Sequence, residues 1–467
     1  MMPAPPLPQV VWDATPPEAR AFIAAVLLQV DALRAEVATL KARLDANSQN
    51  SSRPPSSDPP HVKRQPPRPA TKRKRGGQPG HKRAIRPMVP PEQLAQVVEC
   101  VPKACSCGTA LSGTDPAPHP HQVAELPEVR PDVVEYRLHR LICPACNKAT
   151  RAPLPPGVPA GAFGPRLLAT VALLTGRYRL SKRQVVGALV DLLGLSISVG
   201  MVSKAERRAE AATATPVAEV ARAIATSPAL HVDETGWRQA RKRAWLWTAV
   251  GAGMTLFRID RSRGAAALRR LVGEAIAPAI ISDRFPTYKQ ALVRQICWAH
   301  LRRDFQAMID RAAGGQDVGS KLLALSGRVF GEWRKFTGGL IRRTTLRGTV
   351  GWMRPVVRLL LEAGRDGPCR WTAKVCRQLL MIEGALWTFA RVEGVAPDNN
   401  PAERALRHGV IWRKTSGGTD SERGSRFVGQ ILSVVATCRQ RGHGVLGYLT
   451  RCFRAHFEGL PAPSLIN

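Results

Sequence analysis

The sequence predicts a multidomain protein with an N-terminal coiled-coil helix, a small zinc ribbon, and an α/β core that contains an α-helical insertion. Three observations support this fold class. Apolar residues near the N-terminus repeat at heptad spacing, and five of the ten cysteines fall between Cys100 and Cys146. From residue 229 onward, short apolar runs typical of strands alternate with helical patterns. A chain of 467 residues is long enough for about two to four domains.

The charge of the chain indicates the class of partner. Sixty-nine Lys and Arg residues oppose 35 Asp and Glu residues, which gives a formal net charge of +34. An excess of this size favours a polyanionic partner, and nucleic acid is the first candidate. Hydrophobic residues make up 44% of the chain, which excludes a wholly disordered protein. No signal-peptide or membrane-spanning pattern is visible, so we expect a soluble, cytoplasmic protein with no membrane partner.

Residues 1–47 predict a leucine-zipper-like coiled coil. Most of the a positions are β-branched and most of the d positions are Leu, a combination that favours a parallel dimer. The a positions are Ile23, Val30, Val37 and Leu44, and the d positions are Val26, Leu33 and Leu40. We therefore expect a homodimer or a higher oligomer. The alternative is a single amphipathic helix that packs on the rest of the chain.

Residues 48–87 predict a basic linker rich in Pro and Ser. Between Arg53 and Arg86 there are eleven Lys and Arg residues and one acid, Asp58. An extended basic arm can lie along DNA phosphates and release counterions. The residues expected to contact DNA are Lys72, Arg73, Lys74, Arg75, Lys82 and Arg83. The alternative is a solvated tail that only keeps the protein soluble.

Residues 88–155 predict a zinc-binding domain. Cys143-Pro-Ala-Cys146 is a knuckle whose turn would direct two thiolates toward one tetrahedral Zn²⁺. The other half is less regular: either Cys105 and Cys107 both bind the ion, or Cys100 replaces one of them. The alternating segment at residues 128–142 predicts a strand that joins the two halves. Spare ligand candidates are His119, His121 and His139, and the alternative is a set of unligated thiols.

Residues 160–228 predict three helices, with Ser181 and Ser198 as N-caps. The short connection and the basic final helix are typical of a helix-turn-helix that contacts DNA through Lys204, Arg207 and Arg208. An ordinary helix pair with a Gly-containing turn is the alternative.

Residues 229–457 predict an α/β domain in which acidic residues occupy prominent positions. Asp233 follows an apolar run, Asp283 ends the strand at 277–283, and Glu403 lies in the first turns of a helix that begins near residue 398. The order of three strands, a helix, a strand, a helix, a strand and a helix is that of a ribonuclease-H-like core. A helical insertion at about residues 321–394 separates Asp283 from Glu403.

These three acids predict a divalent-metal site. In the ribonuclease-H-like order the first and fourth strands are neighbours, so Asp233 and Asp283 can share a metal. Carboxylate oxygens are the ligands that Mg²⁺ or Mn²⁺ needs for phosphoryl transfer. The alternative is that the acids cap helices and pair with the surplus arginines.

The motifs together resemble the insertion sequence 66 family of bacterial DDE transposases. They are HVDET, Ser282-Asp283 to Tyr288-Lys289, CWAHLRRDF, DNNPAERALR and WRKTSGGTDSERGSRF. The N-terminal order of zipper, NSQNSSRPPSSD, GGQPGH and cysteine ribbon is also similar. The resemblance covers nearly the whole chain.

The resemblance implies a transposase that binds the ends of a mobile element and cuts and joins double-stranded DNA. The Asp-Asp-Glu triad would be Asp233, Asp283 and Glu403, which would bind two divalent ions. Further residues that match motif positions are Glu234, His300, Arg303, Asn400 and Arg404. The resemblance also implies accessory proteins of the same element and association with the bacterial nucleoid when the protein is bound to DNA.

Two departures from the family pattern stand out. The first cysteine pair is CxC where the family usually has CxxC, and Phe285-Pro286 replaces a small, Gly-containing stretch. Two other functions remain as alternatives: a DNA-binding regulator without catalysis, and a ribonuclease-H-like nuclease that acts on RNA or hybrid.

Overall fold

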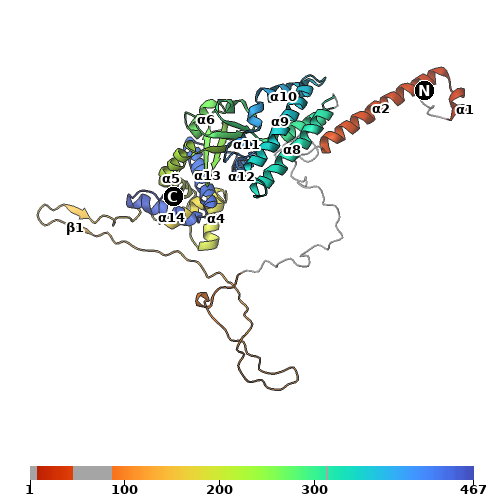
Figure 1. Ribbon diagram of the computed structural model, residues 1–467. Helices are drawn as coiled ribbons and strands as arrows, with labels where there is room; N and C mark the ends of the chain where they lie inside the picture. Colours follow the sequence, from red (N-terminus) through yellow and green to blue (C-terminus); the bar gives the residue numbers. More distant parts are fainter. Residues whose placement is uncertain (1–7, 46–86, 312–313) are drawn as a thin grey trace. The chain divides into compact units, whose positions relative to one another are not determined.

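The computed structural model describes residues 8–45, 87–311 and 314–467 (Figure 1). The chain divides into two units. One contains residues 1–64, 135–187 and 197–467, and the other contains residues 65–134 and 188–196. The predicted linker at 48–87, with its six basic DNA-contact candidates, lies outside the described residues except for its last position.

The N-terminal segment is helical, as the heptad pattern predicts. A short helix, α1 (Gln9–Ala14), precedes the long helix α2 (Pro17–Asp45). The seam residues Val26, Leu33, Val37, Leu40 and Leu44 are exposed, from 39% at Val26 to 81% at Leu44. The helix is therefore confirmed, and its pairing into a coiled coil stays a prediction.

The cysteine-rich segment has little regular structure. It contains one short 3-10 turn, η2 (Pro91–Gln93), and an antiparallel pair, β1 (Arg140–Ile142) and β2 (Ala149–Arg151). The strand expected at residues 128–142 forms only at its last three residues. The physical reason is pairing, because among the described residues only Arg140–Ile142 has a partner strand on which to form a ladder.

Three helices follow, as predicted: α3 (Pro165–Gly176), α4 (Lys182–Leu193) and α5 (Val199–Ala225). Both predicted N-caps form. Ser198 Oγ accepts a hydrogen bond from the N–H of Met201, and Ser181 Oγ accepts one from the N–H of Gln184. The 27-residue helix α5 packs against α3, α13 (Glu422–Gln440) and α14 (Val445–Glu458), so much of its length belongs to the core.

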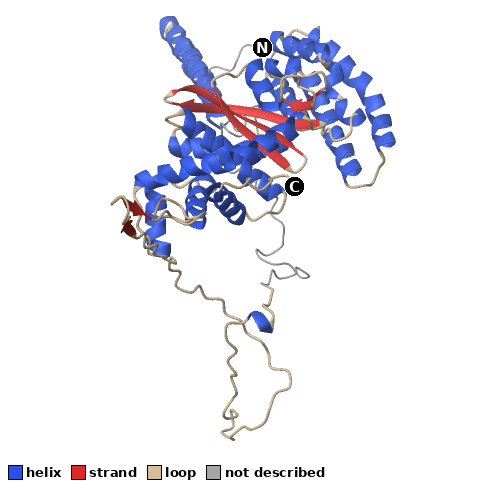
Figure 2. Ribbon diagram, turned by 90° about the vertical axis from the view of Figure 1, so that its left-hand side faces the viewer, coloured by secondary structure: helices blue, strands red, loops and turns tan. Residues whose placement is uncertain are grey.

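A mixed sheet forms the centre of the main unit (Figure 2). Its strands are β3 (Ala229–Gln239), β4 (Lys242–Gly251), β5 (Met254–Asp260), β6 (Ala279–Ser282) and β7 (Arg294–Ile296). The order across the sheet is β5-β4-β3-β6-β7, with β3, β4 and β5 antiparallel and β3, β6 and β7 parallel. Helix α6 (Ala265–Val272) connects β5 to β6, and η3 (Pro286–Gln290) connects β6 to β7. This element order is the one that the sequence predicts, except that a five-residue 3-10 helix takes the place of the second helix.

The segment after β7 is helical and contains the expected insertion. Its elements are α7 (Trp298–Ile309), α8 (Gln316–Thr337), α9 (Arg343–Arg365), α10 (Arg370–Met381), η4 (Glu383–Leu386) and α11 (Thr388–Arg391). They share one apolar cluster, in which Trp298 and Trp387 are in ring contact at 5.0 Å between centroids. The Trp298 indole N–H donates to the carbonyl of Leu386 at 2.8 Å, which ties the start of α7 to the end of the insertion.

Three further helices complete the fold: α12 (Asn400–Ser416), α13 (Glu422–Gln440) and α14 (Val445–Glu458). Glycines allow α12 and α13 to lie directly on the sheet. A Cβ at Gly409 of α12 would collide with Leu246 of β4, and one at Gly429 of α13 would lie 3.0 Å from the carbonyl oxygen of Phe257 in β5. Larger residues at these two positions would push the helices off the sheet.

The edge of β3 beyond its short pairing with β6 is covered by α12 and the loop after it. The carbonyl oxygen of Val232 accepts from the side chain of Asn399, that of Gly236 accepts from the side chain of Arg413, and that of Arg238 accepts from the N–H of Thr419. Buried carbonyl groups need such partners. The motifs DNNPAERALR and WRKTSGGTDSERGSRF therefore also have a structural role, which is to cover this edge.

Candidate active site

Strand β3 places two neighbouring carboxylates on opposite faces of the sheet. Its register pairs Glu234 with Trp247 of β4, so these two side chains share one face. Asp233 shares the other face with Leu246, against which Gly409 of α12 packs. Asp233 is thus directed to the side of the sheet that α12 covers.

Asp283 lies beside Asp233 at the end of the parallel pair. Strands β3 and β6 run in register, with His231 opposite Ile281. The pairing ends there. Asp233 lies two residues further along β3, and Asp283 directly follows the last residue of β6. The Oδ1 atom of Asp283 accepts a hydrogen bond at 2.8 Å from the N–H of the second following residue, which fixes the direction of its carboxylate.

Glu403 comes to the same place through the start of α12. Its N–H bonds to the carbonyl of Asn399, and the Asn399 side chain donates in turn to the carbonyl of Val232 at 2.8 Å. Asn399 is 1% exposed. The residue before Asp233 is therefore joined directly to the first turn of the helix that presents Glu403.

The charges of the three carboxylates act on one another's pKa values. Burial raises the pKa of Asp233 well above its ordinary value, and the charges of Glu234, Asp283 and Glu403 raise it further. Burial also raises the pKa of Glu403, and the charge of Asp283 adds to this effect while Arg303 and Arg404 oppose it. The fold thus brings together the three acids that the sequence singles out, from β3, the end of β6 and α12.

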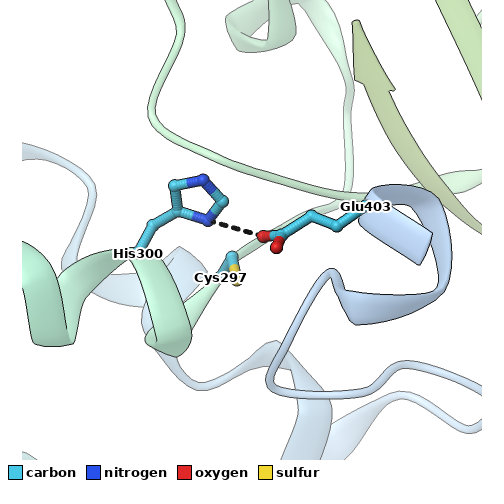
Figure 3. Close-up of side chains that lie close together, drawn as sticks. All are labelled: Cys297, His300 and Glu403. Atoms are coloured by element: carbon cyan, nitrogen blue, oxygen red, sulfur yellow. Dashed lines mark ion pairs between the residues drawn. The ribbon is translucent and has the colours of Figure 1, made fainter. Parts of the chain in front are cut away.

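Cys297 and His300 lie next to Glu403 (Figure 3). One ligand atom from each of the three side chains lies within 4.8 Å of the other two, and His300 Nδ1 is 3.4 Å from Glu403 Oε1. Burial, with neighbouring arginine charges, lowers the pKa of His300 to about 3, so its imidazole is neutral at pH 7. Burial raises the pKa of Cys297 to about 12, so it is a thiol, and its sulfur accepts a hydrogen bond from the N–H of Asn399. Sequence reasoning singled out His300 and missed Cys297, for which it offered no signal beyond the CWAH motif.

The donor set fits a hard divalent cation. Asp233, Asp283 and Glu403 supply carboxylate oxygens, which Mg²⁺ and Mn²⁺ prefer. Glu403 Oε1 is buried and has no hydrogen-bond partner among the described residues. A cation would satisfy this oxygen and would also relieve the repulsion that raises the pKa of Asp233. Cys297 and His300 would suit a softer metal, but the thiol is protonated and already bonded to the backbone of α12.

Glu234 has its own partners on the opposite face. Arg263 pairs with its carboxylate at 2.8 Å, and the hydroxyl of Tyr288 donates to its second oxygen. The Glu234 side chain is 2% exposed. The Arg263 guanidinium also lies 3.9 Å from the centroid of the Phe285 ring. Glu234 is thus engaged by side chains, and no sequence signal pointed to Arg263, which comes from the loop after β5.

The three basic residues of the predicted helix-turn-helix lie in different surroundings. Lys204 and Arg207 are exposed on α5. Arg208 is half-buried, its guanidinium lies over the ring of Phe457 at 6.0 Å, and it approaches Gly161. Arg208 therefore packs within the protein, whereas the other two are free to meet solvent.

The candidate zinc ligands occupy two tight turns, which belong to different units. Cys105 and Cys107 lie in a turn closed by the bridge between Ala104 and Ala110. Hydrogen bonds from the Thr109 hydroxyl and backbone lower the pKa of Cys107 to about 7.

The second turn is the one between β1 and β2. There, the backbone N–H groups of Cys146 and Ala145 lower the pKa of Cys143. Each turn therefore favours a thiolate, which is the form that binds zinc.

Comparisons with known proteins give three findings. A family described as "Transposase IS66 family" matches residues 160–426, more than half of the chain, and a "Family of unknown function (DUF6444)" matches residues 5–87. A protein from Sinorhizobium fredii (strain NBRC 101917 / NGR234), named "Uncharacterized protein y4qI", is 25% identical over 253 residues. That similarity covers 48% of this chain and 46% of the relative, so the chain matches about half of its length. Within the described part of the chain, none of the helices has the length and apolarity needed to cross a bilayer.

Proposed function

Because the chain belongs to the IS66 family of transposases, we propose that it cuts and joins DNA strands at the ends of an insertion sequence through Asp233, Asp283 and Glu403. The observation that carries this proposal is the meeting of these three carboxylates from the middle of β3, the end of β6 and the start of α12. The strand order β5-β4-β3-β6-β7 supports a ribonuclease-H-like core around them. The acids are 50 and 120 residues apart in the sequence, so their meeting is a property of the fold.

The three carboxylates would hold Mg²⁺ or Mn²⁺. When bound, such ions lower the pKa of a nucleophilic water or hydroxyl and neutralise charge on the phosphate under attack. The chain itself fixes the positions of the carboxylates. The backbone bonds at Asp233 and Asp283 fix the two aspartates, and the bond between Asn399 and Val232 fixes the helix that carries Glu403.

Residues around the triad set its charge. Neutral His300 lies against Glu403 without adding a positive charge, so the carboxylate keeps its capacity to bind a cation. The positive charges of Arg303 and Arg404 act on Glu403, and we propose that they also attract the DNA phosphate. Arg284 is held by Asp304 at 2.9 Å, close after Asp283, which keeps a further guanidinium near the site.

The N-terminal half would supply assembly and DNA capture. We propose that the seam of α2 pairs with a second copy to form a homodimer or higher oligomer. The basic segment at residues 48–87 and the exposed Lys204 and Arg207 would bind double-stranded DNA, both element ends and target. Cys105, Cys107, Cys143 and Cys146 would bind one structural Zn²⁺, with Cys100 as the alternative ligand. Accessory proteins of the same element and a cytoplasmic, nucleoid-bound location complete the proposal.

The test is cleavage and joining of DNA that carries the element's flanking ends, with Mg²⁺ or with EDTA. The comparison is between wild type and Asp283→Asn, with Asp310→Asn as a matched control at an acid that ends α7. We expect metal-dependent 3′-hydroxyl ends with wild type and the control, and none with Asp283→Asn, although that variant still binds the DNA ends. Equal cleavage by Asp283→Asn would overturn the assignment of the site.

A DNA-binding regulator without catalysis is the second candidate. It is favoured by the net charge of +34, which accounts for DNA binding without any need for the carboxylates. It predicts tight binding to the ends and no cleavage by wild type, even when cell extract supplies the accessory proteins. Cleavage that appears on addition of extract would instead support the transposase.

A further inference from the structure

A basic groove lies at the end of the sheet where β3 turns into β4. Its volume is about 570 Å³, and five arginines line it: Arg238, Arg241, Arg243, Arg263 and Arg413. Of these, Arg263 alone pairs with a carboxylate, that of Glu234, among the residues that the structure describes. The groove therefore carries a dense positive charge that the protein does not neutralise.

The strand register sets two of these charges directly against each other. Arg238 of β3 lies opposite Arg243 of β4 in the antiparallel ladder. Like charges at such a position destabilise a sheet, since their side chains leave the same face close together. An anion between them would remove this cost, and a phosphate accepts hydrogen bonds from two guanidinium groups at once.

The residues at the start of β4 differ in whether they line the groove. Arg243 and Trp245 line it, whereas Lys242, which lies between Arg241 and Arg243 in the sequence, does not. Lys242 is exposed and pairs with Gln239, on the opposite face of the hairpin. Lys242 is therefore a control for Arg243: the two positive residues are neighbours in the sequence, but only Arg243 lines the groove.

Helix α12 contributes a positioned guanidinium to the groove. The side chain of Arg413 donates to the carbonyl of Gly236 and lies 3.4 Å from the hydroxyl of Thr235. A Cβ at Gly236 would lie only 3.2 Å from the Arg413 Nη1 atom, so the absence of a side chain there makes room for it. A charge held in this way loses little conformational freedom when it meets a ligand.

The groove lies next to elements that carry the candidate active site. Arg263 pairs with Glu234, which follows Asp233 in β3 but lies on the opposite face of the sheet. Arg413 belongs to the helix that carries Glu403, ten residues further on, which is about 15 Å along a helix axis. Nucleotides of one DNA strand rise by about 3.4 Å each, so this distance corresponds to roughly four nucleotides.

We propose that this groove binds the backbone of double-stranded DNA next to the position of strand cleavage, with its arginines on successive phosphates. The identification of the polyanion as DNA rests on the proposed function. The contact is with phosphates and is therefore independent of base sequence. Its residues are different from those of the basic segment at 48–87 and from the exposed basic residues of α5.

The test measures binding of the full-length protein to a labelled duplex of mixed sequence at several salt concentrations in EDTA. Wild type is compared with Arg243→Gln, with Arg238→Gln/Arg243→Gln and, as matched control, with Lys242→Gln. Each lost phosphate contact should reduce the slope of log Kd against log salt by about 0.9. We expect a reduction of about 0.9 for the single variant and nearly twice that for the double variant, with the slope of Lys242→Gln unchanged.

Thermal unfolding of the same proteins separates binding from folding. Because Arg238 and Arg243 repel each other, the Arg243→Gln variant should have a Tm no lower than that of wild type. Equal slopes of log Kd against log salt for Arg243→Gln and Lys242→Gln would overturn the proposal. It would also be overturned if Arg243→Gln changed the slope for duplex RNA but not for duplex DNA.

The outcome does not depend on catalysis, because EDTA is present throughout. If Arg243→Gln and Lys242→Gln have the same salt dependence of Kd, while wild type cleaves DNA ends and Asp283→Asn does not, the groove is rejected and the transposase proposal stands. If the two slopes differ as expected but Asp283→Asn cleaves as well as wild type, the groove is retained and the triad is rejected.

Discussion

Asn399 donates a hydrogen bond from its side-chain nitrogen to the carbonyl oxygen of Val232 at 2.8 Å, across 167 residues of sequence. The bond joins the first turn of α12 to the residue before Asp233. The N–H of the same Asn399 bonds to the sulfur of Cys297, the residue that precedes α7. One buried asparagine thus holds together three of the segments that surround the carboxylates.

Asn399→Ala should therefore lower both stability and the rate of strand cleavage. The loss of a buried hydrogen bond that leaves a carbonyl unpaired costs about 1–3 kcal/mol. The cleavage rate should fall more than DNA affinity does, because the helix that carries Glu403 loses its attachment to β3. Denaturant unfolding and single-turnover cleavage measure the two effects.

Asn400→Ala is the control for stability, since its side chain makes no hydrogen bond within the described part of the chain. If the two alanine variants unfold at the same denaturant concentration, the bond to Val232 does not have the role assigned to it.

Asp233→Asn should stabilise the metal-free protein at neutral pH. Burial and neighbouring acids raise the pKa of Asp233 in the folded state, so the folded state binds more protons than the unfolded chain. Stability due to this group therefore falls as pH rises from about 4, the unfolded value, through the raised folded pKa. Each unit of elevation corresponds to about 1.4 kcal/mol. Asparagine carries no charge and escapes this loss.

Denaturant unfolding in EDTA at pH 4 and pH 7 checks this prediction. The gain in stability of Asp233→Asn should be present at pH 7 and small at pH 4, and added Mg²⁺ should stabilise wild type but not the variant. Asp366→Asn should show no such gain, because Arg365 lowers the pKa of this exposed carboxyl. A variant less stable than wild type at pH 7 would show that the carboxyl is not strained by its surroundings.

Cys143→Ser should abolish zinc binding by the N-terminal half. The four ligands Cys105, Cys107, Cys143 and Cys146 would hold one ion, and a missing thiolate leaves an incomplete tetrahedral site. Metal analysis of the purified protein should give about one zinc per wild-type chain and almost none for Cys143→Ser. Cys100→Ser is the discriminating variant: it should retain zinc, and loss of the ion would transfer the ligand role to Cys100.

Disruption of the α2 seam should lower the oligomeric state. Leu33 and Leu40 are both about half exposed, and pairing with a second copy would bury them. We expect the number of chains per particle, from the mass measured by light scattering, to fall for the double variant Leu33→Glu/Leu40→Glu and for a chain without residues 1–47. Ala32→Glu/Ala38→Glu places the same charges on the outer face of the helix and should leave the mass unchanged. An unaltered number of chains per particle for the truncated chain would refute the coiled coil.

Much of the fold can be predicted from local sequence. The short apolar runs of residues 229–260 predict three strands, and β3, β4 and β5 form there, because strands buried in a sheet are read locally as apolar runs bounded by turns. Ser181 and Ser198 cap their helices as expected, since capping involves residues only three apart. The strand expected at residues 128–142 is mostly absent, because a strand also needs a partner, and alternation alone does not supply one.

The sequence by itself determined the family, the order of strands and helices, and which acids to consider at the candidate site. Asp233, Asp283 and Glu403 stand out because acids are scarce in so basic a chain and because apolar runs and helix starts can be read locally. The end of β3 was not predicted, since the strand continues past Asp233 to Gln239. Only the tertiary structure decided their surroundings. The bond of Asn399 to Val232, the engagement of Glu234 by Arg263 and Tyr288, and the arginine groove all depend on side chains from distant segments. Such contacts follow from strand register and from which face each helix covers, and these are settled by packing of the whole chain rather than by any local pattern.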